Sequence, residues 1–81
     1  MEGCMNYITA IGLRIELLRR QKGVTQRELA VRCNLSRTTV NATIKGRAAI
    51  VTINTILKIC NALQVSFREF FDSELFENII Y

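Results

Sequence analysis

The sequence predicts a single all-α domain of five helices. The chain has 81 residues, which is room for one domain, and its apolar fraction of 49% is sufficient for a packed core. Apolar residues recur at steps of three and four, the spacing that helices require. Proline is absent, and glycine, asparagine, serine and threonine separate the periodic segments, as expected for short turns between helices.

The first helix is predicted over residues 7–22, ending at Gly23, because glycine readily adopts the left-handed conformation of a helix C-terminus. Its apolar face contains Ile8, Ile11, Ile15 and Leu18, broadened by Leu13 and Leu17. Thr25 and Glu28 form a capping box that opens a second helix, which ends at Cys33.

Asn34 is expected to form the turn after the second helix, because asparagine tolerates the left-handed conformation. Ser36 is an N-cap for a third helix, which covers residues 36–45 and ends at Gly46. Most of this helix is polar, and the residues expected to face inward are Leu35, Val40 and Thr43. A helix that buries so little apolar surface usually contacts another molecule through its polar face.

Thr52 caps a fourth helix, residues 53–63, and Ser66 with Glu69 forms a second capping box that opens a short fifth helix. The fourth helix has the apolar pattern Ile53, Ile56, Leu57, Cys60 and Leu63. In the fifth helix, Phe67, Phe70 and Phe71 are expected in the core rather than as stacking platforms for bases, since they lie in an acidic region.

Residues 74–81 are treated as a tail that follows a domain of residues 1–73. This tail either continues the fifth helix as a helical extension or hangs free. Its apolar residues either dock on the same domain or contact another chain, so it is a candidate dimerisation segment. They are Leu75, Phe76, Ile79, Ile80 and Tyr81.

Basic charge is concentrated in the body of the chain. Residues 13–58 contain ten basic and two acidic side chains, whereas residues 66–81 contain one basic and four acidic ones. This division is typical of a polyanion-binding surface with a separate acidic end. A basic surface that is only exposed to solvent and binds no polyanion would show the same numbers of basic and acidic residues.

The residue types exclude several other functions. Histidine is absent, which removes both a Cys/His zinc site and the commonest general base, so we expect no metal, no cofactor and no enzymatic activity. Cys33 and Cys60 are expected to be buried and Cys4 to lie in a loose tail. Neither a membrane span nor a signal peptide is recognisable, which predicts a soluble, cytoplasmic protein.

Residues 25–46 satisfy the demands of a helix-turn-helix motif: two short helices in a basic region, joined by a tight turn. Ala30 is small enough for the helices to cross. Leu29, Leu35 and Val40 are spaced to lock them together. The outward face of the second helix of the motif contains Arg37, Thr38 and Asn41 near its N-terminus.

The stretches TQRELA (residues 25–30) and LSRTTVN (35–41), closed by Gly46, resemble the XRE family of lambda-repressor and Cro-like proteins, and the resemblance extends over about residues 11–71. It implies a lambda-repressor-like fold and a sequence-specific regulator, a repressor that binds double-stranded DNA as a homodimer. The helix at residues 36–45 would read the major groove.

The resemblance also implies roles for individual residues. Arg37 would contact guanine, Thr38 a thymine methyl group and Asn41 adenine. The backbone contacts would be Gln26, Ser36, Thr39, Lys45, Arg47, Arg19 and Arg20. The alternative is that Arg37 and Asn41 are merely solvated.

Three positions depart from the family pattern. Asn34 replaces a turn glycine, Thr43 an aliphatic residue, and Ile44 a glutamate that commonly pairs with Arg19. We therefore expect Ile44 to extend the core and Arg19 to be free for a phosphate. A different class of function is a protein-interaction module, such as an antitoxin or adaptor, in which residues 75–81 bind a protein partner and DNA binding is secondary.

Overall fold

The structure, a computed structural model, describes residues 5–48, 50–77 and 79–80. Within these residues it contains α1 (Tyr7–Lys22), α2 (Gln26–Cys33), α3 (Arg37–Ile44), α4 (Ile53–Leu63), α5 (Phe67–Phe71) and the 3-10 turn η1 (Glu74–Phe76). Two strands of two residues each, β1 (Met5–Asn6) and β2 (Ile79–Ile80), pair in parallel. The predicted all-α class and the order of five helices are confirmed.

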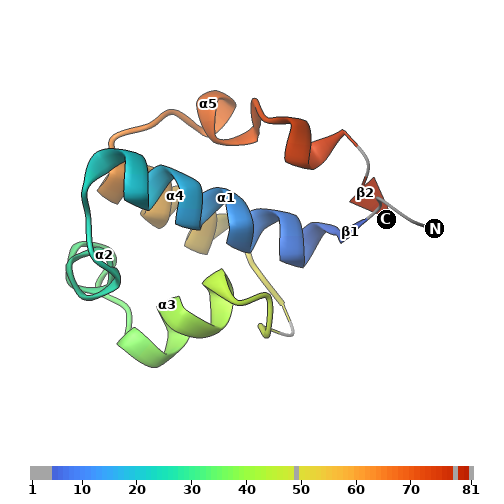
Figure 1. Cartoon of the computed structure of the whole chain (residues 1–81). Coiled ribbons are helices and arrows are strands. Elements are labelled where there is room, and N and C mark those ends of the chain that lie inside the picture. The colour runs from blue at the N-terminus through green and yellow to red at the C-terminus, as the bar shows by residue number, and fades with distance from the viewer. Residues whose placement is uncertain (1–4, 49, 78, 81) are drawn as a thin grey trace.

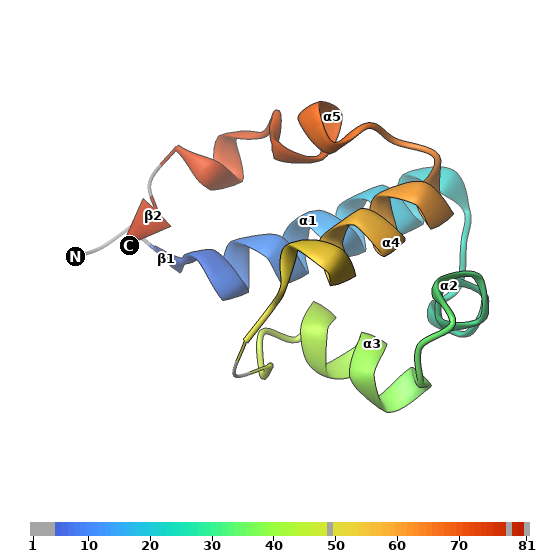
Figure 2. The same ribbon diagram turned by 180° about the vertical axis from the view of Figure 1, so that it is seen from behind.

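Helices α1 and α4 lie side by side in the middle of the molecule (Figure 1). Helices α2 and α3 lie on one side of this pair, and α5 and η1 lie on the other, as Figure 2 shows from behind. Helix α3 and the C-terminal segment are therefore on opposite sides. None of the helices in the described residues is long and apolar enough to cross a membrane.

Each helix begins at a side chain that accepts a hydrogen bond from the backbone N–H three residues later, which satisfies one of the orphan donors of the first turn. The N-cap residues are Asn6, Thr25, Ser36, Thr52 and Ser66. Both predicted capping boxes, Thr25 with Glu28 and Ser66 with Glu69, are confirmed.

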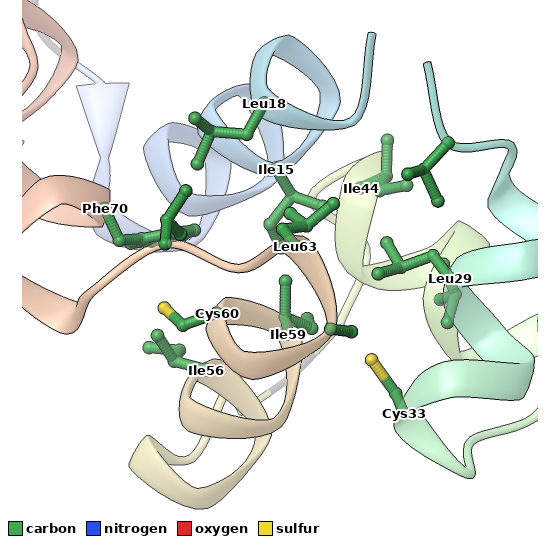
Figure 3. Packing of buried hydrophobic residues seen from close by; sticks show 14 of the residues in the cluster. Ile15, Leu18, Leu29, Cys33, Ile44, Ile56, Ile59, Cys60, Leu63 and Phe70 are labelled. Atoms are coloured by element: carbon green, nitrogen blue, oxygen red, sulfur yellow. The ribbon is translucent and has the colours of Figure 1, made fainter. Parts of the chain in front are cut away.

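One apolar core joins all five helices (Figure 3). The side chains that are completely or almost completely enclosed are Ile15, Leu29, Val40, Ile59, Leu63 and Phe70. Ile59 was not among the residues predicted to face inward. The buried stripe of α4 runs through Ile56, Ile59, Cys60 and Leu63, because α4 packs against both α1 and α2.

Five residues predicted to be apolar contacts are instead exposed, and these predictions are wrong. They are Leu13, Leu17, Ile53, Leu57 and Phe67. On α1 and α4 the buried stripe is narrower than the apolar pattern. Phe67 lies at the start of α5 and packs on Phe71, with the ring centroids 4.9 Å apart.

The backbones of α1 and α3 approach closely at Gly12, which is buried. A Cβ atom at this position would lie 2.6 Å from the carbonyl oxygen of Thr43 and also too near that of Ile44. Only glycine allows this contact. Ile44 is buried, as expected, and so is Thr43, whose hydroxyl donates to the carbonyl of Thr39.

Arg14 ties the C-terminal segment to α1. Its guanidinium donates to the carbonyl oxygens of Phe70 and Glu69, each at 2.8 Å, and to that of Asp72 at 3.5 Å. These carbonyls belong to the last turn and C-cap of α5, where helices leave acceptors unsatisfied. The charged donor thus stabilises a helix of five residues that is too short to persist alone.

The segment after α5 does not continue that helix, and the helical extension expected there is the separate 3-10 turn η1 over Glu74–Phe76. Asp72 ends α5, and Phe76 in η1 packs against the core. The tail was expected either to dock on its own domain or to contact another chain. Residues 74–77 dock on their own domain. The side chains of Ile79 and Ile80 and the predictions made for Cys4 and Tyr81 lie outside the described residues.

Replacing Gly12 with alanine should lower the free energy of unfolding by about 1–3 kcal/mol, because the new methyl group overlaps backbone carbonyls of α3. Helix propensity alone would give the opposite sign, a gain of about 1 kcal/mol. Urea denaturation measures the difference. Gln21→Ala, at an exposed site of the same helix, should change stability by less than about 0.5 kcal/mol. A Gly12→Ala protein as stable as the wild type would contradict the close approach.

Arg14→Met keeps much of the aliphatic stem but removes the charged donor. We expect a loss of about 1.5–3 kcal/mol, the contribution of hydrogen bonds from a charged group. Hydrogen exchange should become faster at the backbone amides of α5 and η1. Arg68→Met, at an exposed position of α5, is the matched control. Equal exchange rates in both variants would show that Arg14 does not hold this segment.

Candidate nucleic-acid interface

Helix α3 is held against α2 by the residues that the sequence pattern indicated. Leu29, Ala30 and Val40 are buried, and Leu35 is half-buried against the core. Asn34 adopts the left-handed conformation at φ 57°, and the N–H of Leu35 reaches back to the carbonyl of Ala30 at 3.0 Å. The turn therefore forms without the glycine that is usual in this family.

Five of the ten residues predicted to contact DNA line one concave surface of about 470 Å³, which we call the α3 groove. They come from the start of α2, the outer face of α3 and the loop after it. Arg37, Thr38 and Arg47 are exposed, whereas Gln26 and Asn41 are half-buried. The α3 groove is lined by Gln26, Arg37, Thr38, Asn41, Ala42 and Arg47.

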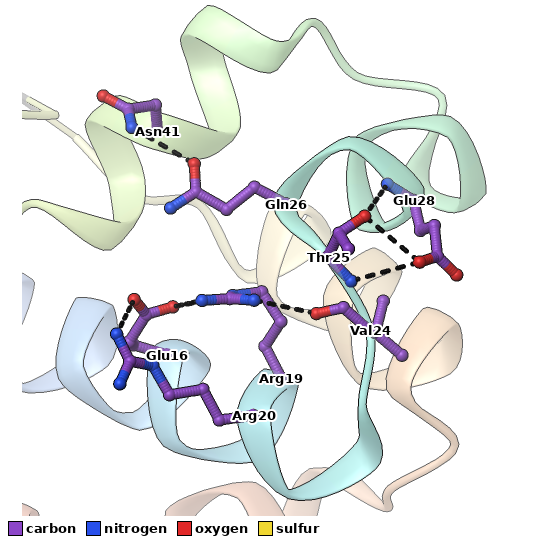
Figure 4. Close-up of polar contacts among 8 residues, drawn as sticks. All are labelled: Glu16, Arg19, Arg20, Val24, Thr25, Gln26, Glu28 and Asn41. Atoms are coloured by element: carbon purple, nitrogen blue, oxygen red, sulfur yellow. Dashed lines mark hydrogen bonds and ion pairs between the residues drawn. The ribbon is translucent and has the colours of Figure 1, made fainter.

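Gln26 and Asn41 are hydrogen-bonded to each other across the α3 groove (Figure 4). The Nδ2 of Asn41 donates to the Oε1 of Gln26 at 3.1 Å. The remaining polar atoms of the two amides have no partner among the described residues. The backbone anchor and the base-reading residue predicted from the sequence are therefore in direct contact.

Ser36 and Thr39 lie at the start of α3, outside the α3 groove. The Ser36 hydroxyl accepts from the N–H of Thr39 at 3.1 Å and donates to the Thr39 hydroxyl at 2.8 Å. Both residues are exposed. Their first role is to cap α3, which aligns the free backbone amides of its first turn toward solvent.

A family model described as Helix-turn-helix, HTH_3, matches residues 15–70. The match contains the whole of α2, α3 and α4. This protein belongs to the XRE-type helix-turn-helix family. It is thus a DNA-binding regulator of transcription.

Solved structures agree with the family match. The restriction-modification controller protein C.AhdI from Aeromonas hydrophila is 34% identical, over 79% of this chain and 96% of that chain, with a TM-score of 0.74. The wild-type controller protein C.Esp1396I is 30% identical over 88% and 91%, with a TM-score of 0.78. The clp gene regulator ClgR from C. glutamicum is 31% identical over 76% and 79%, with a TM-score of 0.72. A comparison with curated proteins gave no match.

Arg19 has an intramolecular partner in this helix-turn-helix protein, so the expectation that it is free is wrong. Its Nε donates to Glu16 at 2.6 Å and its Nη1 to the carbonyl of Val24 at 2.9 Å (Figure 4). Only 15% of the Arg19 side chain is exposed. In related proteins a glutamate at the position of Ile44 commonly pairs with this arginine. Here Glu16, one turn earlier on α1, is the partner of Arg19 instead. Arg20 is 72% exposed and stays a predicted backbone contact.

Several basic residues of the body are engaged inside the protein. Arg14 binds backbone carbonyls, Arg19 and Arg20 pair with Glu16, and Arg32 pairs with Glu28 and donates to the carbonyl of Ala62. In contrast, none of the ion pairs formed by the described residues includes Arg37, Lys45 or Arg47. Lys22, Arg27, Lys58 and Arg68 also form none of these ion pairs, so unpaired positive charge lies on several elements, and Arg37, Lys45 and Arg47 place part of it along and just beyond α3.

The two described cysteines are structural. Cys33 and Cys60 are buried, and their burial raises the pKa of both thiols. Nucleophilic attack and metal binding require the thiolate, which a raised pKa disfavours. In the described part of the chain no three histidine, cysteine, aspartate or glutamate residues form a metal-binding group.

Sequence reasoning missed Ala42, which lines the α3 groove between Thr38 and Arg47. Its signal was available, because residues four apart lie on the same face of a helix and Ala42 follows Thr38 by four. A small side chain here leaves room for a base edge or phosphate to approach α3.

Proposed function

We propose that this protein is a repressor that binds operator DNA as a homodimer, with α3 of each subunit in the major groove. The observation that supports this proposal is the α3 groove, which places side chains suited to base edges beside side chains suited to phosphates. The family match and the likeness to two restriction-modification controllers support it as well.

On this proposal, the exposed guanidinium of Arg37 donates to O6 and N7 of guanine, and Thr38 packs on a thymine methyl group. Gln26, at the start of α2, donates to a phosphate that the N-terminal amides of α2 also attract. Lys45, the C-cap of α3, and Arg47, just after it, contact the backbone at the C-terminal end of α3. The backbone contacts fix the register, while Arg37 and its neighbours read the sequence.

The dimer surface is proposed at an apolar groove of about 350 Å³ on the opposite end of α1 from α2. It is lined by Tyr7, Ile11, Val51, Ile53, Ile56, Phe71 and Phe76. Ile53 is 65% exposed and the neighbouring Ile50 is 75% exposed, and contiguous apolar surface of this kind marks interaction sites more often than single exposed side chains do. We call this surface the Ile53 groove.

A second copy of the chain is the proposed partner because one α3 helix reaches only a few bases. Two copies related by a twofold axis would place two such helices about 34 Å apart, the distance of one helical turn of DNA. Val51, just before α4, lines the Ile53 groove, and we propose that pairing there holds both α3 helices on one face of the dimer. Phe76, in the C-terminal segment, is one of the residues that line the Ile53 groove.

The alternative of an antitoxin or adaptor relied on a C-terminal segment available for another protein. In the structure η1 packs on α1 and Phe76 packs against the core. We therefore favour the DNA-binding regulator.

Arg37→Ala should lower affinity for the preferred duplex by about tenfold or more and relax the preference for one base pair. Gel shifts over a salt series, with duplexes from the neighbourhood of the gene, measure both quantities. Arg47→Ala should instead weaken all duplexes about equally and reduce the salt slope by about one.

Arg68→Ala is the control for a surface arginine, because α5 lies on the far side from α3 and Arg68 is exposed. It should bind as the wild type does. The proposal fails when no duplex binds above background, or when Arg37→Ala binds with unchanged affinity and preference.

Ile53→Glu should abolish self-association without unfolding the chain, since a carboxylate is compatible with the first turn of a helix. Sedimentation velocity should show a monomer, and DNA binding should lose affinity and cooperativity. Val31→Glu is a matched control, because Val31 is 76% exposed on α2 and lies outside the Ile53 groove. Equal association of both variants and the wild type would exclude this surface as the dimer contact.

A further inference from the structure

We infer that Arg14 is a positioning residue for self-association, because it fixes the segment that supplies part of the Ile53 groove. The inference rests on the proposed function, since it takes the Ile53 groove as the surface that pairs two copies of the chain. Arg14 itself does not line this groove. The affinity of the dimer would thus depend on a side chain outside the dimer surface.

Two parts of the chain line the Ile53 groove. The first part consists of α1, α4 and the residue before α4, with side chains such as Ile11 and Ile56. The second part is Phe71, the last residue of α5, and Phe76, the last residue of η1, which we call the aromatic lining. Helices α1 and α4 have 16 and 11 residues, whereas α5 has five and η1 has three. The aromatic lining therefore has the least secondary structure to support it.

Arg14 binds the backbone on both sides of Phe71. Its Nε donates to the carbonyl of Phe70 at 2.8 Å, and its Nη2 donates to those of Glu69 at 2.8 Å and Asp72 at 3.5 Å. Hydrogen bonds from a charged donor are stronger than those between neutral groups. Three acceptors within four consecutive residues fix the path of the backbone where α5 ends. The direction of the Phe71 side chain is therefore determined from α1.

The Phe71 ring in turn positions Phe76. Their ring centroids are 4.9 Å apart, and the ring of Phe70 lies 5.0 Å from that of Phe71 and 6.1 Å from that of Phe76. Phe70 is completely buried, so one ring of the three is fixed in the core. Rings packed at these distances restrain one another. A shift of the backbone next to Phe71 would therefore displace both residues of the aromatic lining.

Removing Arg14 should let the aromatic lining open while the rest of the domain stays folded. In the described part of the chain, Arg14 is the side chain that donates to these three carbonyls. Segments with few contacts of their own open locally at a lower free energy than the core does. Helices α1 to α4 keep their mutual contacts in such an opening.

Local opening weakens the dimer in a calculable way. The apparent dissociation constant is the intrinsic one divided by the fraction of chains in the pairing arrangement. Both subunits contribute an aromatic lining, so this fraction enters twice. A lining that is closed about one third of the time weakens the dimer roughly tenfold.

The test is sedimentation equilibrium of the full chain over a range of concentrations, at a temperature where circular dichroism shows that every variant is folded. Arg14→Met should raise the dissociation constant of the dimer about tenfold or more. Arg68→Met removes an arginine from an exposed position of α5 and should stay within about twofold of the wild type.

Thr25→Ala separates positioning from a general loss of stability. It removes the capping box of α2, which destabilises the fold away from the Ile53 groove. This variant should keep the dissociation constant of the wild type. Phe76→Ala removes part of the aromatic lining directly. In that background Arg14→Met should have a smaller effect than in the wild type, because the two residues act on the same surface.

DNA binding gives a second readout. Arg14→Met should need more protein for half-saturation of the preferred duplex, because fewer chains are dimers. It should reach the same saturation with the same base preference, since α3 lies on the opposite side of the molecule from α5 (Figure 1).

The inference is overturned when Arg14→Met dimerises as the wild type does, when Thr25→Ala weakens the dimer equally, or when Arg14→Met keeps its full effect beside Phe76→Ala. A changed base preference in Arg14→Met overturns it as well. In these cases the wild type still dimerises and binds DNA, and the proposed function stands. A wild type that stays monomeric, or an Ile53→Glu variant that dimerises normally, overturns the proposed dimer surface together with the inference.

Discussion

The close approach of α1 and α3 at Gly12 is the contact on which the position of α3 and of the α3 groove depends. Helix α3 has eight residues, too few to be stable alone, and its buried side chains are Val40, Thr43 and Ile44. Its C-terminal turn rests directly on the α1 backbone because Gly12 has no side chain. With α2 packed on its other end, α3 is held at both ends and its polar face is left outward.

Electrostatic pairing inside the domain determines which positive charges remain for a polyanion. Glu16 forms the ion pair with Arg19 that a glutamate on α3 commonly forms in the family. Position 44 therefore needs no carboxylate and holds the buried Ile44. Burying Arg19 without a partner would have cost several kcal/mol. The same helix directs Arg14 to the C-terminal segment, on the side away from α3. Arg14 and Arg19 of α1 thus stabilise the fold, whereas Arg20 is 72% exposed and Lys22 is in none of the ion pairs of the described residues.

Helix boundaries could be predicted from the sequence because a helix cap is formed by residues that are close together in the sequence. The Ser36 cap and the two capping boxes each involve residues three apart in the sequence. Asparagine is one of the few residue types that adopt the left-handed conformation, which Asn34 does. The Arg14 contact with Phe70 joins residues 56 apart, and no local pattern indicates it. Five of the six residues that line the α3 groove were predicted from the motif and Ala42 was missed, whereas the bond between Gln26 and Asn41 depends on how α2 and α3 pack.

The acidic end of the chain does not oppose DNA binding, because the fold separates it from α3. Glu69, Glu74 and Glu77 lie on α5 and the segment after it, with α1 and α4 between them and the recognition helix. Exposed charges further apart than about 10 Å are largely screened at physiological salt. The apolar side of this segment, through Phe71 and Phe76, instead lines the Ile53 groove. If the proposed dimer forms at this groove, a change in the C-terminal segment acts on DNA affinity through dimerisation rather than through direct repulsion of phosphates.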